Sequence, residues 1–137
     1  MKTTAAKLSK LQNELTDLAI QIAAGSNIKL DFSIESVKQI EVILGVIHKD
    51  YKKDKQEEGV RGIALEFAAY VISVIERNLE KGYWQRDSEE SGKDSFPYFL
   101  SDDSVIFPYS WCLKRIIDGS SEDVWLKFQT LVLKKGE

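Results

Sequence analysis

Cysteine, histidine and proline are scarce in this chain of 137 residues, which contains one, one and two of them. One cysteine excludes an internal disulfide and a zinc site made of several cysteines. One histidine excludes a metal site with several histidine ligands. The formal net charge of -3 argues against non-specific binding to nucleic acid, which requires a positive surface that displaces counterions. We therefore expect no nucleic-acid partner and no metal site of these kinds.

Long apolar segments are also missing. Charged residues between Lys7 and Asp17 interrupt the N-terminal segment, so it lacks the apolar stretch of about 7–15 residues that a secretory signal needs. No segment approaches the roughly 18 apolar residues of a membrane span. We expect a cytoplasmic protein without membrane contact, in which Cys112 is reduced and behaves as a small hydrophobic residue.

The composition, with 43% hydrophobic and 30% charged residues, is typical of a globular domain. The length lies within the range of about 100–200 residues per domain, and no Pro/Gly/Ser-rich linker divides the chain. We therefore expect residues 1–137 to form one domain. Within it, ten of the fourteen aromatic residues lie after residue 82.

Helical periodicity dominates the first part of the chain. An apolar stripe with spacings of three and four residues predicts an amphipathic helix that ends at Gly25. The stripe consists of Leu8, Leu11, Leu15, Leu18 and Ile22. A second helix is expected to begin near Ser33, as its N-cap, and to lead into a charged connector over residues 52–59.

A third helix is expected over residues 60–81. It is apolar on nearly all sides between Ile63 and Ile75, which is typical of a buried central helix. Because burial of an unpaired carboxylate is costly, Glu66 should meet a cation, a hydroxyl or a backbone donor, or face a cleft. Polar side chains of this helix, spaced four, three and four residues apart, share one face. This polar stripe consists of Glu66, Tyr70, Ser73 and Arg77.

The hydrophobic period changes after Gly82. The short aromatic and β-branched segments YWQRD, FPYFL and VIFP predict strands. A polar loop over residues 87–95 and a turn at residues 101–104 separate them.

Two further helices are expected after the strands. Pro108 suits the first position of a helix over about residues 108–118, which ends at Gly119. Ser120 or Ser121 then caps a last helix. The order of elements predicts an α+β fold with three N-terminal helices, a small antiparallel β-sheet of two or three strands, and two C-terminal helices.

Three segments of the second half read AYVISVIERN, GYWQRD and IFPYSWCLKRIIDG. They resemble a family of small bacterial cytoplasmic domains, with A-Y-x-G-E-x-I-R-R, a Gly step before a Trp, and F-P-x5-K-R followed by Gly. The match covers about residues 60–120. Its positions are Ala69, Tyr70, Val74, Ile75, Arg77, Gly82, Trp84, Phe107, Pro108, Lys114, Arg115 and Gly119. The Gly-Glu pair of the family falls on Ile72 and Ser73, so its acidic position is lost here. The resemblance implies no established activity, although some relatives lie beside polymorphic toxins and behave like immunity proteins.

The residues form no catalytic constellation. His48 is the only imidazole, and the VIHKD segment around it matches no hydrolase motif, so we expect a structural role. Adjacent carboxylates such as Asp102 and Asp103 lie in polar segments, where a turn explains them. The segment EEGVRGIAL lacks the third glycine and the Lys-Ser/Thr pair of phosphate-binding loops. We therefore expect no catalytic residue, no metal ligand and no cofactor.

These observations favour a non-enzymatic protein-interaction domain: an adaptor or, as the resemblance implies, an immunity-like protein that binds and neutralises a partner toxin. Aromatic residues and arginine are the usual anchors of protein interfaces, and the C-terminal half combines them with acidic loops that would steer a basic partner. The candidate contact residues are Trp84, Trp111, Lys114, Arg115, Glu89 and Glu90.

Two other interpretations stay open. If the polar stripe lines an open pocket, with Arg77 free to bind an anion, the chain is a small-ligand-binding protein or a weak enzyme. If the N-terminal leucine stripe does not pack on its own domain, it forms a seam with a second copy. The chain is accordingly expected to be a monomer or a homodimer.

Overall fold

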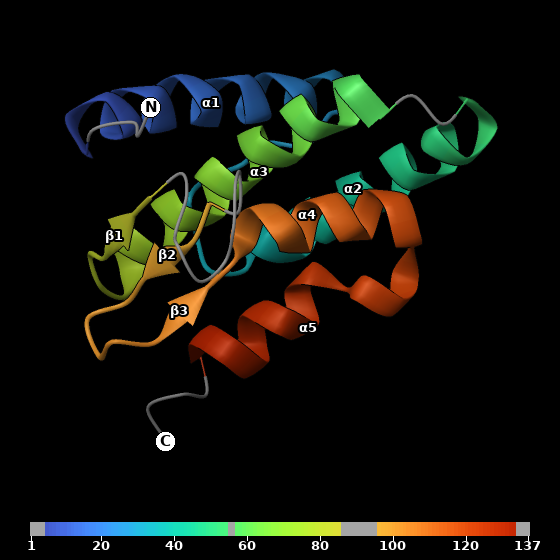
Figure 1. Ribbon diagram of the computed structural model, residues 1–137. Coiled ribbons are helices and arrows are strands. Elements are labelled where there is room, and N and C mark those ends of the chain that lie inside the picture. The colour runs from blue at the N-terminus through green and yellow to red at the C-terminus, as the bar shows by residue number, and fades with distance from the viewer. Residues whose placement is uncertain (1–4, 55–56, 86–95, 134–137) are drawn as a thin grey trace.

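Helices surround one long central helix, and a small sheet lies beside the end of that helix (Figure 1). The computed structural model describes residues 5–54, 57–85 and 96–133. The α-helices of this part are α1 (Ala5–Gly25), α2 (Ser36–Asp54), α3 (Glu57–Asn78), α4 (Pro108–Asp118) and α5 (Val124–Phe128). The strands are β1 (Tyr83–Trp84), β2 (Tyr98–Phe99) and β3 (Val105–Ile106). The predicted α+β fold is therefore confirmed.

The central helix is α3. All side chains from Phe67 to Ile75 are buried, as the apolar sequence predicts. Figure 1 shows α1 along one side of α3 and α4 on the other, with α2 and α5 packed against α4 and each other. The helix begins at Glu57 and ends at Asn78, three residues earlier at each end than the predicted 60–81. It ends early because the amides of Leu79 and Glu80 both donate to the Ile75 carbonyl, which closes the last turn.

The buried face of α1 differs from the predicted leucine stripe. The side chains that are buried under this helix are those of Gln12, Thr16, Ala19 and Ala23. Leu11 and Leu18 remain 36% and 44% exposed. The polar residues are tolerated inside because Gln12 and Thr16 hydrogen-bond to α3. The expectation that the leucines face the core was therefore wrong for Leu11 and Leu18.

The second helix begins close to its predicted start. The Ser33 hydroxyl accepts a hydrogen bond from the Ser36 amide at 3.1 Å, so Ser33 caps the first turn as expected. The helix continues to Asp54, which makes the first residues of the charged connector helical. Its buried side includes Val37, Ile40 and Leu44.

The three strands form an antiparallel meander in the order β1-β2-β3. In the register, Trp84 pairs with Tyr98, and Tyr98 pairs with Ile106. These three side chains are buried, so they form the inner face of the sheet. The turn predicted at residues 101–104 is confirmed, since the Leu100 amide donates to the Ser104 carbonyl across it.

The two C-terminal helices occur in the predicted order, but the residue that caps the second of them differs from the prediction. Pro108 occupies the first turn of α4, and Gly119, with φ of 98°, ends the helix. Residues Ser120–Glu122 form a turn of 3-10 helix, so neither predicted serine caps α5. Asp123 caps it instead, because its side chain accepts the Leu126 amide at 2.8 Å.

Candidate interaction surface

The predicted aromatic and basic contact residues are mostly interior. Trp84 and Trp111 are buried, and the Trp84 indole donates to the Phe96 carbonyl at 3.2 Å. Arg115 is only 7% exposed. Lys114 alone among these four residues is exposed. The other two predicted residues, Glu89 and Glu90, lie outside the described residues.

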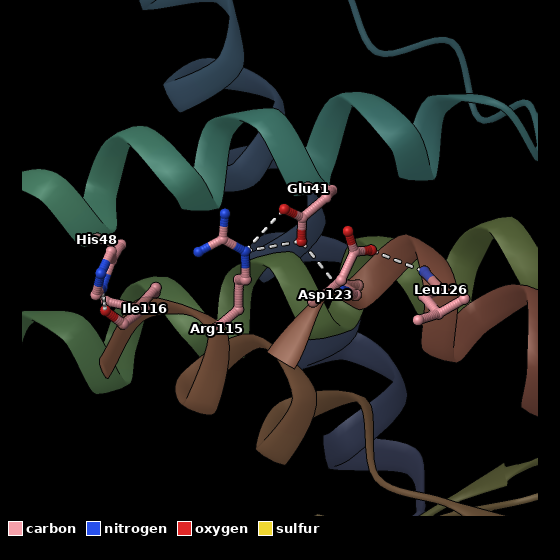
Figure 2. Close-up of polar contacts among 7 residues, drawn as sticks. Glu41, His48, Arg115, Ile116, Asp123 and Leu126 are labelled. Carbon is pink, nitrogen blue, oxygen red and sulfur yellow. Dashed lines mark hydrogen bonds and ion pairs between the residues drawn. The ribbon is translucent and has the colours of Figure 1, made fainter. Parts of the chain in front are cut away.

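Arg115 forms a buried ion pair rather than a surface patch (Figure 2). Its Nε donates to both oxygens of Glu41, at 2.9 and 2.8 Å. Glu41 also accepts the backbone amide of Val124 at 2.9 Å. The same carboxylate therefore connects α2, α4 and the start of α5, which gives Arg115 a structural role in this arrangement.

His48 lies near this ion pair and holds the end of α4. Its Nδ1 is 2.6 Å from the Ile116 carbonyl oxygen, so the ring donates through Nδ1 (Figure 2). The expectation of a structural role for His48 fits this contact. No nucleophile of the described residues hydrogen-bonds to the ring.

The polar stripe of α3 separates into distinct contacts. Tyr70 is fully buried, and its hydroxyl accepts the Phe32 amide at 2.9 Å and lies 2.7 Å from the Ser36 hydroxyl. Burial raises the pKa of Tyr70, more than these hydrogen bonds lower it. Ser73 instead donates to the Ala69 carbonyl and meets α1. Tyr70 thus joins α3 to the start of α2 and the segment before it, and Ser73 joins α3 to α1.

The two charged members of the stripe lie at its ends. Glu66 is partly buried, and burial raises the pKa of its carboxyl group. The structure gives it no ion-pair partner among the described residues. Arg77 is exposed and its guanidinium carbon lies 3.5 Å from the centre of the Phe32 ring. The stripe therefore does not converge on a single site.

A carboxylate that the sequence did not single out connects α1, α3 and β2. Glu76 accepts the Gln12 side-chain amide at 3.0 Å and the Tyr98 hydroxyl at 3.1 Å. The Tyr98 hydroxyl in turn accepts the Gly82 amide at 2.6 Å. Burial, followed by the charge of Glu76, raises the pKa of Tyr98 well above its usual range. This network joins α1, α3 and β2 to the segment just before β1.

No group of three or more potential metal ligands occurs in the described residues. Cys112 is fully buried, and burial raises the pKa of its thiol far above the usual range, which disfavours the reactive thiolate. In the same residues, no helix is long and apolar enough to cross a membrane.

An exposed apolar face is present on the other side of the sheet. The register places Tyr83 opposite Phe99 and Phe99 opposite Val105, so the three side chains share one face. Tyr83 is 48% exposed and Val105 is 40% exposed, while Phe99 lies half-buried between them. The rings of Tyr83 and Phe99 are 6.1 Å apart. We call these three residues the outer sheet face.

Acidic side chains lie beside the outer sheet face. Asp102 and Asp103 occupy the turn between Phe99 and Val105, and the Asp102 carboxylate accepts the Ser104 amide at 3.0 Å. Glu80 reaches the same turn, because its carboxylate accepts the Ser101 amide at 2.9 Å. These contacts place the three acidic residues at the turn that joins β2 and β3.

The sequence contains a signal for this face. In each two-residue strand one side chain must point inward and the other outward. Each strand carries two apolar residues, so the outward one is apolar as well. The predicted anchor Trp84 belongs to the inner set, and its neighbour Tyr83 belongs to the outer one.

Residues of the described part of the chain line at least two cavities. One, of about 280 Å³, is lined by Ile75, Asn78, Leu79, Glu80, Leu100, Val132 and Leu133. The other, of about 260 Å³, is lined by Ile47, Asp50, Tyr51, Asp54, Gly59, Val60 and Ile63. No residue of the polar stripe lines either cavity, so they do not support a ligand site there.

Comparison with known proteins gives no match: no family model, no curated protein and no solved structure is significantly similar to the chain. The resemblance of residues 60–120 to small bacterial domains therefore stays a prediction.

Proposed function

We propose that the chain is a non-enzymatic protein-interaction domain that binds its partner through the outer sheet face. The observation that carries the proposal is the exposure of Tyr83 and Val105 on either side of Phe99. Adjacent exposed apolar residues on three strands are a typical feature of protein contact sites. The inner face of the same sheet is buried, so the fold does not need the outer residues for its own core.

The chemistry of this face suits a protein partner. Tyrosine and phenylalanine provide large contact areas at low conformational cost, which is why aromatic residues anchor interfaces. The cross-strand neighbours hold these rings in place before binding. The acidic turn that joins β2 and β3, with Asp102 and Asp103, favours a partner with basic residues around its contact site.

The specific form of the proposal is an immunity-like protein that binds and neutralises a partner toxin in the bacterial cytoplasm. It rests on the resemblance of residues 60–120 and on the acidic surroundings of the outer sheet face. The reduced state expected of the single, buried Cys112 agrees with that location. A small-ligand or weakly catalytic role is not favoured, because Tyr70 and Ser73 are bound to other parts of the chain.

The proposal is tested by capture of partners from a lysate of the source organism, quantified by mass spectrometry at low and moderate salt. The full-length chain is compared with the variants Tyr83→Ser and Val105→Ser, whose side chains are exposed enough for the fold to survive. Leu126→Ser is the matched control, since Leu126 is 61% exposed and belongs to α5, which contributes no residue to the outer sheet face.

The expected result is one stoichiometric protein that the wild type and Leu126→Ser retain and that both sheet variants lose. A protein retained equally by all four chains would exclude the outer sheet face as the contact site. Circular dichroism of each variant shows that the loss is not caused by unfolding.

A further inference from the structure

The cavity of about 280 Å³ lies at the end of α3, and we call it the α3 cavity. Three segments that are distant in the sequence provide its apolar lining: the end of α3, the residue after β2, and the segment that follows α5. Ile75, Leu100 and Val132 are buried, whereas Leu79 is 45% exposed, so solvent reaches this part of the lining. A cavity of this size with aliphatic walls suits the body of a small organic molecule.

Two polar side chains line the α3 cavity, and both present hydrogen-bond acceptors. The Glu80 carboxylate is held in position by the Ser101 amide, which donates to it at 2.9 Å. The Asn78 side-chain amide donates to the Phe32 and Val74 carbonyls at 2.7 and 2.8 Å, which uses both of its hydrogens. The Asn78 oxygen is therefore the part of this side chain that can bind another group. A ligand that matches these two side chains must supply donors.

The charge of the lining is negative. The last carbonyl groups of α3, a helix of 22 residues, carry a partial negative charge at this end, and the Glu80 carboxylate adds to it. The described residues that line the α3 cavity include no lysine, arginine or histidine. Arg77 and Lys81 are close in sequence but exposed, and the Arg77 guanidinium lies over the Phe32 ring, which is not part of the lining. The donor group of the ligand is therefore expected to be a cation.

The C-terminal wall of the α3 cavity has a rare backbone conformation. A single turn of π-helix, Gln129–Leu133, follows α5 directly. Such turns are uncommon in proteins and often occur at functional sites. Val132 and Leu133 of this turn belong to the lining, so the unusual turn lies at the cavity itself.

We propose that the α3 cavity binds a small organic ammonium ion with an apolar body. The ammonium group donates to the Glu80 carboxylate and the Asn78 oxygen, and the apolar body packs against the aliphatic side chains of the lining. A lysine side chain of another protein has the same head group, but its stem ends in a polar backbone, so the aliphatic walls favour a small-molecule amine. The site shares no residue with the outer sheet face, which makes this inference independent of the proposed function.

Nuclear magnetic resonance titration of the isotopically labelled full-length chain with hexylammonium tests the proposal. Hexanol and hexanoate serve as the uncharged and the anionic analogue. We expect saturable binding of hexylammonium in about the millimolar range, about tenfold or more tighter than that of either analogue. The largest shifts should occur at the backbone amides of Leu79, Glu80, Leu100 and Leu133. Absence of saturable shifts at these amides, or equally tight binding of hexanol, would overturn the proposal.

Glu80→Gln removes the charge and keeps an acceptor for the Ser101 amide, so the fold should persist, which circular dichroism checks. We expect this variant to bind hexylammonium about tenfold or more weakly. Asp50→Asn is the matched control, because Asp50 lines the other cavity, and it should bind like the wild type. Equal affinity of Glu80→Gln and the wild type would overturn the proposal.

A last titration separates the two sources of an ammonium group. Acetyl-lysine methylamide, with its free ammonium group, represents a lysine side chain of a partner protein. We expect it to bind more weakly than hexylammonium, because less of it is apolar. Tighter binding of the lysine derivative would overturn the assignment to a small-molecule amine.

Discussion

The Nε of Arg115 lies 2.8 Å from one oxygen of Glu41, although 74 residues separate the two in the sequence. The pair joins α4 to α2, and the same carboxylate holds the Val124 amide at the start of α5. Arg115 Nη1 is buried and has no hydrogen-bond partner in the described part of the chain. The ion pair with Glu41 is therefore the main interaction that compensates the guanidinium group for its lost hydration.

Arg115→Met should therefore destabilise the fold by about 3–5 kcal/mol, because it leaves the Glu41 carboxylate without its cation in a dry contact. Urea denaturation followed by circular dichroism measures the change. Lys127→Ala is the matched control, since Lys127 pairs with Glu122 on a more exposed part of the surface and should cost about 1 kcal/mol or less. Equal losses for the two variants would contradict the structural role of the buried pair.

Gly45 lies where α2 meets this ion pair. A Cβ atom at Gly45 would approach Arg115 Nη2 to 2.8 Å, whereas one at Gly62 would meet nothing within 4 Å. Gly62→Ala should stabilise the chain by about 0.5–1 kcal/mol through helix propensity. Gly45→Ala should instead destabilise the chain, because the new methyl group would clash with the Arg115 guanidinium, which its bonds to Glu41 hold in place. A stabilising Gly45→Ala in the same urea measurement would show that the guanidinium moves freely.

Tyr98 and Tyr83 provide a matched pair in the sheet. Tyr98→Phe removes the donor to Glu76 and the acceptor of the Gly82 amide, so we expect a loss of about 1–3 kcal/mol. Tyr83→Phe removes only an exposed contact with the Gln85 side chain and should change stability by less than about 0.5 kcal/mol. Thermal or urea unfolding of both variants checks this difference, and similar values for the two would refute the buried network.

Glu66 should make stability depend on pH. Its pKa is raised in the folded chain by burial, so the folded state holds the proton more tightly than the unfolded state. Stability is therefore lost as the pH rises from the ordinary carboxyl pKa of about 4.3 through the raised value. Glu66→Gln should increase the melting temperature at neutral pH and leave it unchanged at a pH well below 4. The exposed Glu14→Gln controls for removal of one charge, and an equal effect of both variants would contradict this account.

The sequence predicts the order of elements well because the strongest signals are local. The apolar run of α3 and the position of Pro108 at the start of α4 fix those helices without knowledge of the rest. The face of α1 was not predictable in this way. Gln12 is acceptable inside because Ser73 and Glu76 accept its side-chain amide, and the pairing with Glu76 spans 64 residues.

The contact residues were harder to predict than the fold. Tryptophan and arginine often anchor interfaces, but they also occur in cores, as Trp84 and Arg115 do here. The sequence does not show that Arg115 forms an ion pair with Glu41, 74 residues away. Strands of two residues are too short for a period-2 pattern to show which side chain points outward. The strand register and the burial of the side chains show which residue points outward. The exposed aromatic residue of β1 is Tyr83, and the predicted contact residue Trp84 is buried.

Tyr83 is the exposed aromatic anchor of the contact that we propose between the outer sheet face and a partner protein. The most direct test of this contact is calorimetric titration of the captured partner with the wild type, Tyr83→Ser and Leu126→Ser. We predict that Tyr83→Ser weakens binding by about tenfold or more, as the loss of an aromatic anchor does, and that Leu126→Ser binds like the wild type. An affinity of Tyr83→Ser equal to that of the wild type would contradict the claim.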